Sequence, residues 1–278
     1  MKTNCELPLC MFNQNLTLNE YDFVLFHLYY KNEAYRNYYK EIRKLYPERL
    51  MIFDNSAYEF FVNGGSLDCE AFTDAIIELK PDYYILPDYL MDYKNTLESS
   101  KEFIKQFGDK ITKSKPMGVL QGRGYMDFST LLYLYKNLGI SAIAIPFHND
   151  WYLDIEIADD IFWDFMEEFG GDNKDANYAM GRVQVIRNMS HWFGDYEHIH
   201  LLGSHQPFEK KFYKHFVYKN FAIDTMDTGY PVKLAIEGKE LGTEISKPNI
   251  IIDEFFDKNL DNCTKALIEH NIWEFRNL

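Results

Sequence analysis

Short apolar runs alternate with longer amphipathic segments along most of the chain. Each run is rich in β-branched or aromatic residues, ends in a polar or glycine-containing turn, and precedes a segment with helical periodicity. This pattern predicts strands at 21–30, 49–58, 82–90, 115–122, 140–147, 198–204 and 221–228. It predicts helices at 31–46, 67–79, 93–107 and 125–139, with one or two more near the C-terminus.

Strand-then-helix alternation predicts a parallel sheet, and continuous apolar runs are typical of strands buried on both faces. Seven such units within 278 residues favour a (β/α)8 TIM-like barrel, which needs about 250 residues. The position of the eighth strand stays open between the N-terminal segment and 233–238, and a doubly wound open sheet is the alternative fold. The chain reads as one domain, 1–278, with a helical insertion at 148–197 between strands five and six.

Composition narrows the possible classes of protein. The formal net charge is −14, which excludes a protein that binds nucleic acid through its whole surface. The four cysteines form no Cys-x-x-Cys pair and no Cys/His cluster with four ligands, so we expect reduced thiols and no bound metal. The sequence shows no convincing signal peptide and no apolar stretch of about 18 residues, which indicates a cytoplasmic protein that does not span a membrane.

Polar residues recur where the predicted strands end, and barrel enzymes carry their catalytic groups at the carboxyl ends of strands. Carboxylates that converge there suit either a Mg²⁺ or Ca²⁺ site or nucleophilic and acid/base chemistry at an anomeric carbon. An amide next to a glycine, as in Gln121–Gly122, suits the edge of a flat heterocycle. The residues at the predicted ends are Asp54, Asp88, Gln121, His148, Gly203, Asp224 and Asp227.

Four segments at these ends resemble, in order, motifs of the tRNA-guanine transglycosylase family: FDNSAYEFFVNGG, VLQG, HLLGS and AIDTMDT. The family's zinc-binding Cys-x-Cys-x-x-Cys…His subdomain is missing, and GYPVKLAIEG stands where the family has Leu-Pro-Thr-Arg. The chain is therefore most similar to the phage DpdA branch, the DNA 7-deazaguanine transglycosylases. This resemblance implies a (β/α)8 barrel that exchanges guanine in DNA for a 7-deazaguanine base of the preQ0 type, with DNA and that base as its partners.

The resemblance also implies roles for individual residues. Asp227 would attack the sugar and form a glycosyl-aspartate, with Asp224 as the alternative nucleophile, and Asp54 would carry the proton. The exchange would need no cofactor and no metal. The residues implied to bind the substrate are Asp88, Gln121, Gly122, Gly203, Ser56 and Tyr58.

Other interpretations of the same residues stay open. Asp54 could cap the turn that follows it, and Asp92 could replace Asp88 as the ligand. The chain could also be a tRNA enzyme without the zinc domain, a metal-dependent hydrolase, or a non-catalytic binding subunit, and its oligomeric state is open. His148, His191 and His205 are expected to be surface or supporting groups, and Trp151, Trp163 and Trp192 to be core.

Two basic stretches with interleaved aromatic residues are candidate nucleic-acid contacts despite the acidic balance. A solvated helix face explains each of them equally well. The candidate residues are Arg36, Lys40, Arg43 and Lys44 on the first long helix, and Lys210, Lys211 and Lys214 in the second stretch.

Overall fold

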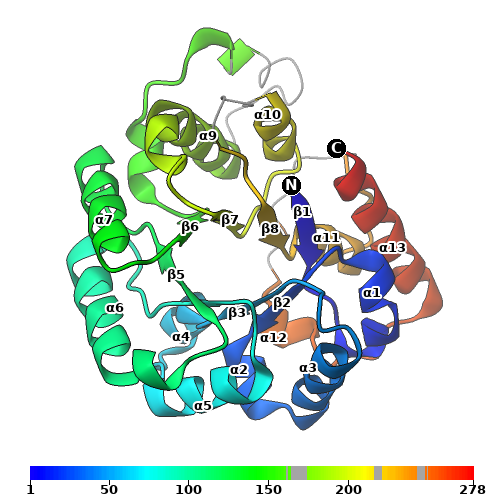
Figure 1. Ribbon diagram of the computed structural model, residues 1–278. Coiled ribbons are helices and arrows are strands. Elements are labelled where there is room, and N and C mark those ends of the chain that lie inside the picture. The colour runs from blue at the N-terminus through cyan, green and yellow to red at the C-terminus, as the bar shows by residue number, and fades with distance from the viewer. Residues whose placement is uncertain (161, 164–173, 216–220, 243–247, 249) are drawn as a thin grey trace. The chain divides into compact units, whose positions relative to one another are not determined.

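The computed structural model describes residues 1–160, 162–163, 174–215, 221–242, 248 and 250–278. In these residues eight strands form one all-parallel sheet in the order β1-β8-β7-β6-β5-β4-β3-β2 (Figure 1). This is the predicted α/β class, a (β/α)8 TIM-like barrel. The strands are β1 (Lys2–Cys5), β2 (Asp22–Leu25), β3 (Met51–Asp54), β4 (Tyr83–Ile85), β5 (Lys115–Val119), β6 (Ala142–Pro146), β7 (His198–Leu202) and β8 (Thr225–Thr228).

The strand that the sequence pattern left open is β1, in the N-terminal segment. It pairs in parallel with β8, so that Asn4 lies opposite Asp227. The other candidate, 233–238, lies mostly in helix α11, Tyr230–Ile236. Pro231 occupies the first turn of that helix, where its fixed φ and missing N–H are tolerated.

Helices follow most of the strands, close to the predicted positions, but one of them, Phe26–Lys31, lies inside the segment 21–30 that was predicted as a strand, because β2 ends at Leu25. Between β6 and β7 the segment 148–197 contains a 3-10 turn, η3 (Asp150–Asp154), and the 20-residue helix α9 (Lys174–Phe193). The other elements are η1 (Leu9–Gln14), α1 (Asn15–Leu18), α2 (Phe26–Lys31), α3 (Glu33–Leu45), α4 (Ala57–Asn63), α5 (Cys69–Leu79), α6 (Tyr93–Phe107), η2 (Gly108–Lys110), α7 (Tyr125–Asn137), α10 (Glu209–His215), α12 (Ile252–Phe255) and α13 (Asn262–Asn277).

The chain divides into two compact units. The terminal unit comprises 1–20, 147–194 and 201–278, and the central unit comprises 21–146 and 195–200. In the terminal unit α13 packs against α11 and α1 (Figure 1). In the central unit α2 packs against α3 and α5.

Aromatic rings fill the core of the central unit. Phe53 on β3 stacks on Phe72 of α5, with ring centroids 5.3 Å apart and planes at 23°. Phe26 of α2 meets the same Phe72 edge to face at 5.1 Å, and Phe103 of α6 lies 5.9 Å from it. Such offset and edge-to-face pairs add stability beyond the area they bury. A large part of the aromatic content of this unit therefore serves packing.

The tryptophans divide between the interior and the surface. Trp151 is buried, as predicted, whereas Trp163 and Trp192 are exposed, so the prediction was wrong for these two. Trp192 is the second-last residue of α9 and is exposed to 39%. Across the described part of the chain, no helix combines the length and the apolar character that crossing a membrane requires.

Helix α9 packs very closely on η3 because one of its buried residues is a glycine. A Cβ atom placed on Gly181 would lie 2.2 Å from the backbone oxygen of Tyr152, well inside contact distance. The absence of a side chain at Gly181 therefore permits this contact between helix and turn.

We predict that Gly181→Ala destabilises the protein, although Gly→Ala within a helix normally stabilises it by up to about 1 kcal/mol. The added methyl must push the backbone of Tyr152 away, and overpacking of this kind costs about 1–3 kcal/mol. Thermal unfolding followed by circular dichroism should show a melting temperature lower by several degrees. Gly124→Ala, where an added Cβ atom would meet nothing within 4 Å, is the control and should shift it much less; a higher melting temperature for Gly181→Ala would contradict the close packing.

Candidate functional site

The structure places most of the predicted site residues at the carboxyl ends of strands. Asp54 is the last residue of β3, Gly203 directly follows β7, and Asp227 is the third of the four residues of β8. The position predicted for Asp224 is wrong. This residue precedes β8, and its carbonyl oxygen accepts a hydrogen bond from the N–H of Lys2 at the start of β1 (2.7 Å). Because β8 begins only at Thr225, Asp224 lies at the amino end of the strand and not beside Asp227.

In the central unit, Asp54 opens a tight turn. Its Oδ2 accepts a hydrogen bond from the N–H of Ser56 (2.7 Å), the capping contact that was the alternative to a catalytic role. Ser56 adopts a left-handed conformation (φ 60°), which is uncommon for a residue other than glycine. The Ser56 Oγ in turn accepts from the backbone N–H of His27 (3.1 Å) and lies 3.0 Å from Nδ1 of its ring. The buried Asp54 carboxylate is thus fixed by its own turn.

Asp88 lies between two side-chain amides. Asn55 Nδ2 donates to Asp88 Oδ1 (2.8 Å), and Gln121 Nε2 donates to Oδ2 (2.7 Å). The Gln121 Oε1 accepts from the backbone N–H of Met91 (2.8 Å), a second residue with positive φ (57°). Burial raises the pKa of Asp88, and the hydrogen bonds from Asn55 and Gln121 oppose this rise. Each Asp88 oxygen accepts one of these two hydrogen bonds and can accept a further hydrogen bond from a ligand.

Asp92, which the sequence offered as an alternative to Asp88 for binding the substrate, caps a helix instead. Its Oδ1 accepts a hydrogen bond from the N–H of Asn95 (3.0 Å), which makes Asp92 the N-cap of α6.

Gly122 packs so closely that a Cβ atom there would lie 2.5 Å from Cβ of Asp127. The loop after β5 therefore tolerates only glycine at this position without movement.

A fully buried ion pair organises the terminal unit. Arg182 of α9 donates from Nε and Nη2 to the two carboxylate oxygens of Glu209 (2.6 and 2.7 Å), and neither side chain is exposed. The same guanidinium donates to the backbone oxygens of Leu202 (3.1 Å) and Gly203 (2.9 Å). Burial by itself lowers the pKa of Arg182, but the Glu209 carboxylate more than offsets this, so the pKa is raised. The pair fixes the loop after β7.

That loop holds Asp227. The N–H of Gly203 donates to Asp227 Oδ1 (2.8 Å), and Gly203 has a positive φ of 65°, which glycine adopts without strain. Next to Asp227, the Thr228 hydroxyl donates to the backbone oxygen of Ser204 (2.5 Å). Ser204 Oγ donates to Glu209 (3.1 Å), which links the loop back to the buried ion pair.

A second carboxyl group, Glu6, stands in the loop after β1 and is influenced electrostatically by Asp227. Its backbone N–H donates to the oxygen of Thr228 (3.0 Å), and Gly229 leaves room for its carboxylate. Burial raises the pKa of Glu6, the Lys233 ammonium opposes that rise, and the negative Asp227 carboxylate adds to it. Glu6 therefore binds a proton more tightly than an ordinary glutamate.

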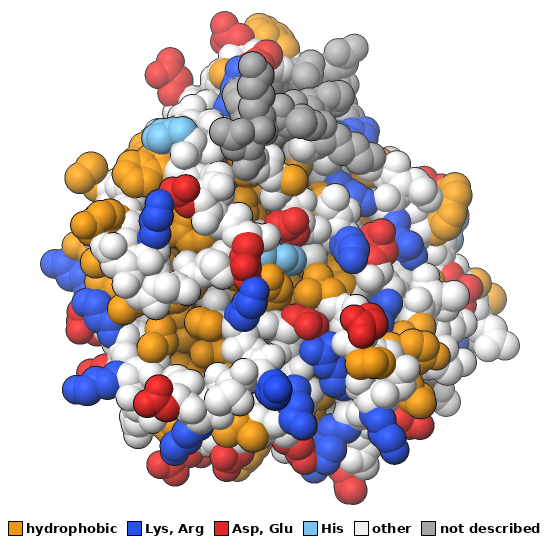
Figure 2. Space-filling model, viewed as in Figure 1, with side chains coloured by type: hydrophobic (Ala, Val, Ile, Leu, Met, Phe, Trp, Pro, Cys, Tyr) orange, Lys and Arg blue, Asp and Glu red, His pale blue; other side chains and the backbone are white. Residues whose placement is uncertain are grey.

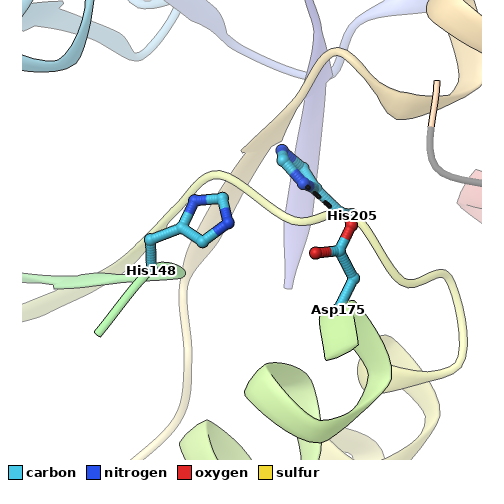
Figure 3. Close-up of side chains that lie close together, drawn as sticks. All are labelled: His148, Asp175 and His205. Atoms are coloured by element: carbon cyan, nitrogen blue, oxygen red, sulfur yellow. Dashed lines mark ion pairs between the residues drawn. The ribbon is translucent and has the colours of Figure 1, made fainter. Parts of the chain in front are cut away.

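One group of side chains in the described residues has the composition of a metal site: His148, Asp175 and His205, all in the terminal unit (Figure 3). One potential ligand atom from each lies within 4.8 Å of the others. Of the three histidines expected to be surface or supporting groups, His191 is exposed, and His148 and His205 are half-buried in this group.

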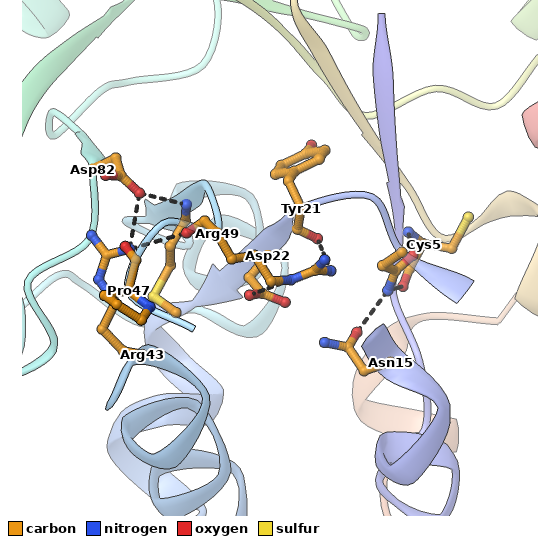
Figure 4. A network of polar contacts seen from close by, with 10 residues as sticks. Cys5, Asn15, Tyr21, Asp22, Arg43, Pro47, Arg49 and Asp82 are labelled. Carbon is orange, nitrogen blue, oxygen red and sulfur yellow. Dashed lines mark hydrogen bonds and ion pairs between the residues drawn. The ribbon is translucent and has the colours of Figure 1, made fainter. Parts of the chain in front are cut away.

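The basic residues of α3 bind other parts of the central unit. Arg36 donates to the backbone oxygen of Tyr29 (3.0 Å), and Lys40 forms an ion pair with Glu78. Arg43 donates to Asp82 and to two backbone oxygens of the turn before β3 (Figure 4). Figure 2 shows basic and acidic side chains intermixed over this part of the surface. Of the four predicted residues, Lys40 and Lys44 are exposed, and Arg36 and Arg43 are half-buried.

The second basic stretch differs from the prediction at Lys210. This side chain is buried, and its Nζ donates to the backbone oxygens of Phe275 and Arg276 near the end of α13 (3.1 and 2.6 Å). A lysine there satisfies helix C-terminal carbonyls, so Lys210 has a structural role. Lys211 is half-buried, and the side chain of Lys214 lies outside the described residues.

Sequence reasoning missed several residues that these contacts make important. Asn55 stands inside the segment that carried the resemblance, between Asp54 and Ser56. Glu6 follows a strand whose position the pattern left open. Arg182, Glu209 and Asp175 lie on helices, where nothing in the sequence distinguishes them from surface charges.

Comparison with known proteins does not assign the chain to a family. No protein-family model matches the chain, and no curated protein matches it. The resemblance to transglycosylases therefore depends on the four short motifs.

We predict that Arg182→Met destabilises the protein by about 3–5 kcal/mol, because Glu209 is left buried without its cation. Arg182→Met/Glu209→Leu should recover part of this loss, since no unpaired charge remains. Equilibrium unfolding in urea measures both. Lys136→Met, which breaks the exposed Lys136–Asp195 pair, is the control and should change stability little. Equal small effects of Arg182→Met and Lys136→Met would show that the buried pair does not hold the loop.

Proposed function

We propose that the chain is a DNA-guanine transglycosylase, which exchanges guanine in DNA for a 7-deazaguanine base through a covalent glycosyl-aspartate. The proposal combines the four motif resemblances with the polar contacts of their residues. A target guanine would first leave the base stack, because its glycosidic bond cannot be reached inside the duplex.

The observation that carries the proposal is the position of Asp227. Its carboxylate lies at the carboxyl end of a barrel strand, the end at which barrel enzymes carry catalytic groups. One of its oxygens accepts the Gly203 N–H, whose loop is held by the buried Arg182–Glu209 pair. A nucleophile held in one orientation loses little freedom when it attacks, which favours the reaction.

In the proposed reaction an Asp227 oxygen bonds to C1′, and the bond from C1′ to guanine N9 breaks with its electron pair on the base. Guanine leaves after it takes up one proton. The incoming 7-deazaguanine gives up its N9 proton, bonds to C1′ and releases the Asp227 carboxylate. Two displacements retain the configuration of the sugar.

Asp88 is the proposed acceptor for the guanine edge that carries N1–H and N2–H₂. Its two oxygens are oriented by Asn55 and Gln121. In this proposal Gln121 acts mainly through Asp88, because both ends of its amide are already hydrogen-bonded. An oriented acceptor rejects bases that lack the matching donors, because its own lone pairs would then stay unsatisfied.

Two carboxyl groups are candidates for the proton carrier. Asp54 has this role by the resemblance, although its contact with Ser56 N–H also suits a capping residue. Glu6 is favoured by its raised pKa and by its electrostatic coupling to Asp227. A carboxyl group with a pKa nearer neutrality is the better acid and base at neutral pH.

Exposed apolar side chains in the segments after β3, β4 and β5 support a nucleic-acid substrate. Helix α4, directly after the Asp54 turn, has no buried residue and carries the exposed Tyr58 and Phe61. Tyr89 and Met126, after β4 and β5, are exposed to 54% and 78%. Exposed aromatic rings are platforms on which unpaired bases stack, whatever the identity of the base.

We predict that Asp227→Ala abolishes both guanine release and the covalent adduct, because no attacking oxygen remains. Mass spectrometry of nucleosides and of peptide 221–233 after incubation with DNA and a 7-deazaguanine base measures both. Asp224→Ala, at the opposite end of β8, is the matched control and should keep activity. An adduct on Asp224, or wild-type exchange by Asp227→Ala, would contradict the assignment.

The same assay separates the proton carriers. Glu6→Gln and Asp54→Asn each remove one titrating group, and loss of the true carrier should lower turnover by about 10²–10⁴-fold while DNA binding persists. If only Asp54→Asn has this effect, Glu6 is not the carrier. Wild-type turnover by both variants would refute both assignments.

We also predict that Phe61→Ala weakens the binding of a guanine-containing oligonucleotide by about 1–3 kcal/mol, since one base would lose its stacking partner. Fluorescence anisotropy measures the affinity. Trp273→Ala removes an equally exposed ring on α13 and should leave the affinity unchanged. If both variants bind like the wild type, α4 does not contact the nucleic acid.

A further inference from the structure

Three side chains from separate segments of the terminal unit share one small space. His148 follows β6, Asp175 stands in the first turn of α9, and His205 lies in the loop after β7. Nδ1 of His205 is 3.6 Å from Oδ2 of Asp175, and the His148 and His205 rings stand nearly perpendicular, with centroids 5.2 Å apart. Figure 3 shows the Asp175 carboxylate turned toward the space between the two imidazoles.

Neighbouring contacts hold these segments in place. The N–H of Phe147 donates to the oxygen of Leu202 (2.9 Å), which joins the ends of β6 and β7. The Phe147 ring packs on His205 at 4.9 Å, and the edge of Tyr178 meets His148 at 5.1 Å. The Tyr178 hydroxyl donates to Asp150 (2.6 Å), which fixes that ring. The three groups are therefore brought together by the packing around them.

Two imidazoles and one carboxylate are the donor set of zinc hydrolases and of non-haem iron centres. Imidazole nitrogen disfavours Mg²⁺ and Ca²⁺, which take oxygen ligands. Metal–ligand bonds of about 2.0–2.1 Å place neighbouring tetrahedral ligands about 3.3 Å apart. The His205–Asp175 pair is already near that distance, and the ligand atoms of the whole group, which lie within 4.8 Å of one another, would have to approach more closely to bind one ion.

We propose that His148, Asp175 and His205 bind one divalent transition metal ion of the zinc class, with at least one coordination position left open to water or to a ligand. The proposal does not depend on the proposed base exchange, and it differs from the metal-free protein that the cysteine pattern predicted. The ion ties α9 to the loops after β6 and β7, and the latter loop also carries Gly203, the donor to Asp227.

The test uses the full chain after removal of metal with a chelator. Titration with Zn²⁺ by calorimetry should show one ion per chain, and the melting temperature should rise when the ion binds. Co²⁺ in its place should give a visible spectrum of nitrogen and oxygen ligation without a thiolate charge-transfer band, which excludes the four cysteines as ligands.

The ligand variants make the proposal specific. His205→Ala and Asp175→Ala should each weaken Zn²⁺ binding at least about tenfold. Removal of a group that only hydrogen-bonds to a metal ligand already lowers metal affinity by about that factor. In metal-free buffer both variants should melt as cooperatively as the wild type. His191→Ala changes an exposed histidine on the same helix as Asp175 and should bind Zn²⁺ like the wild type. No saturable Zn²⁺ binding by the wild type, equal affinity in His205→Ala, or a thiolate band with Co²⁺ would each overturn the proposal.

Discussion

The buried ion pair between Arg182 and Glu209 is the contact on which the arrangement of the terminal unit depends. Two charges without solvent are stable only when each is paired and its remaining hydrogen-bonding groups are satisfied. Here the remaining guanidinium donors are satisfied by backbone oxygens of the loop after β7, and the carboxylate also accepts from Ser204 and Tyr213. Movement of the loop would therefore leave buried guanidinium donors without acceptors.

The buried ion pair is connected to the proposed functional residues by a few contacts. The fixed loop presents the Gly203 N–H to Asp227, and His205 two residues later faces Asp175 on the helix that also carries Arg182. One helix, α9, thus contributes the buried cation and a carboxylate of the proposed metal site. Its close packing on η3 at Gly181 fixes where both residues stand.

In the central unit a carboxylate is also held in one orientation, but by neutral side chains. Two side-chain amides orient Asp88, and the turns that hold them include Ser56 and Met91, which adopt positive φ. Backbone strain of this kind persists only where surrounding contacts over-determine it, and it concentrates at functional sites. Within the central unit the rings divide by role, with Phe53 and Phe72 packed in the core and Phe61 and Tyr89 exposed.

Much of the fold could be predicted from the sequence, because hydrophobic periodicity reports which face of an element is buried. Seven of the eight strands and the helices α3, α5, α6 and α7 stand close to their predicted positions, and the strand ends at Asp54 and Asp227 follow directly. The first strand is only four residues long, Lys2–Cys5, and its first residue is exposed. Four residues are too few for periodicity to separate a strand from a loop.

The sequence by itself determined the barrel class and the candidate acids. Only the tertiary structure decided that Asp224 stands at the wrong end of its strand and that Lys210 is buried against α13. It also decided that His148, Asp175 and His205 meet. The physical reason is that periodicity encodes burial within one element, whereas ion pairs and ligand sets join residues far apart in the chain. Their geometry is set by packing between elements, which no local pattern records.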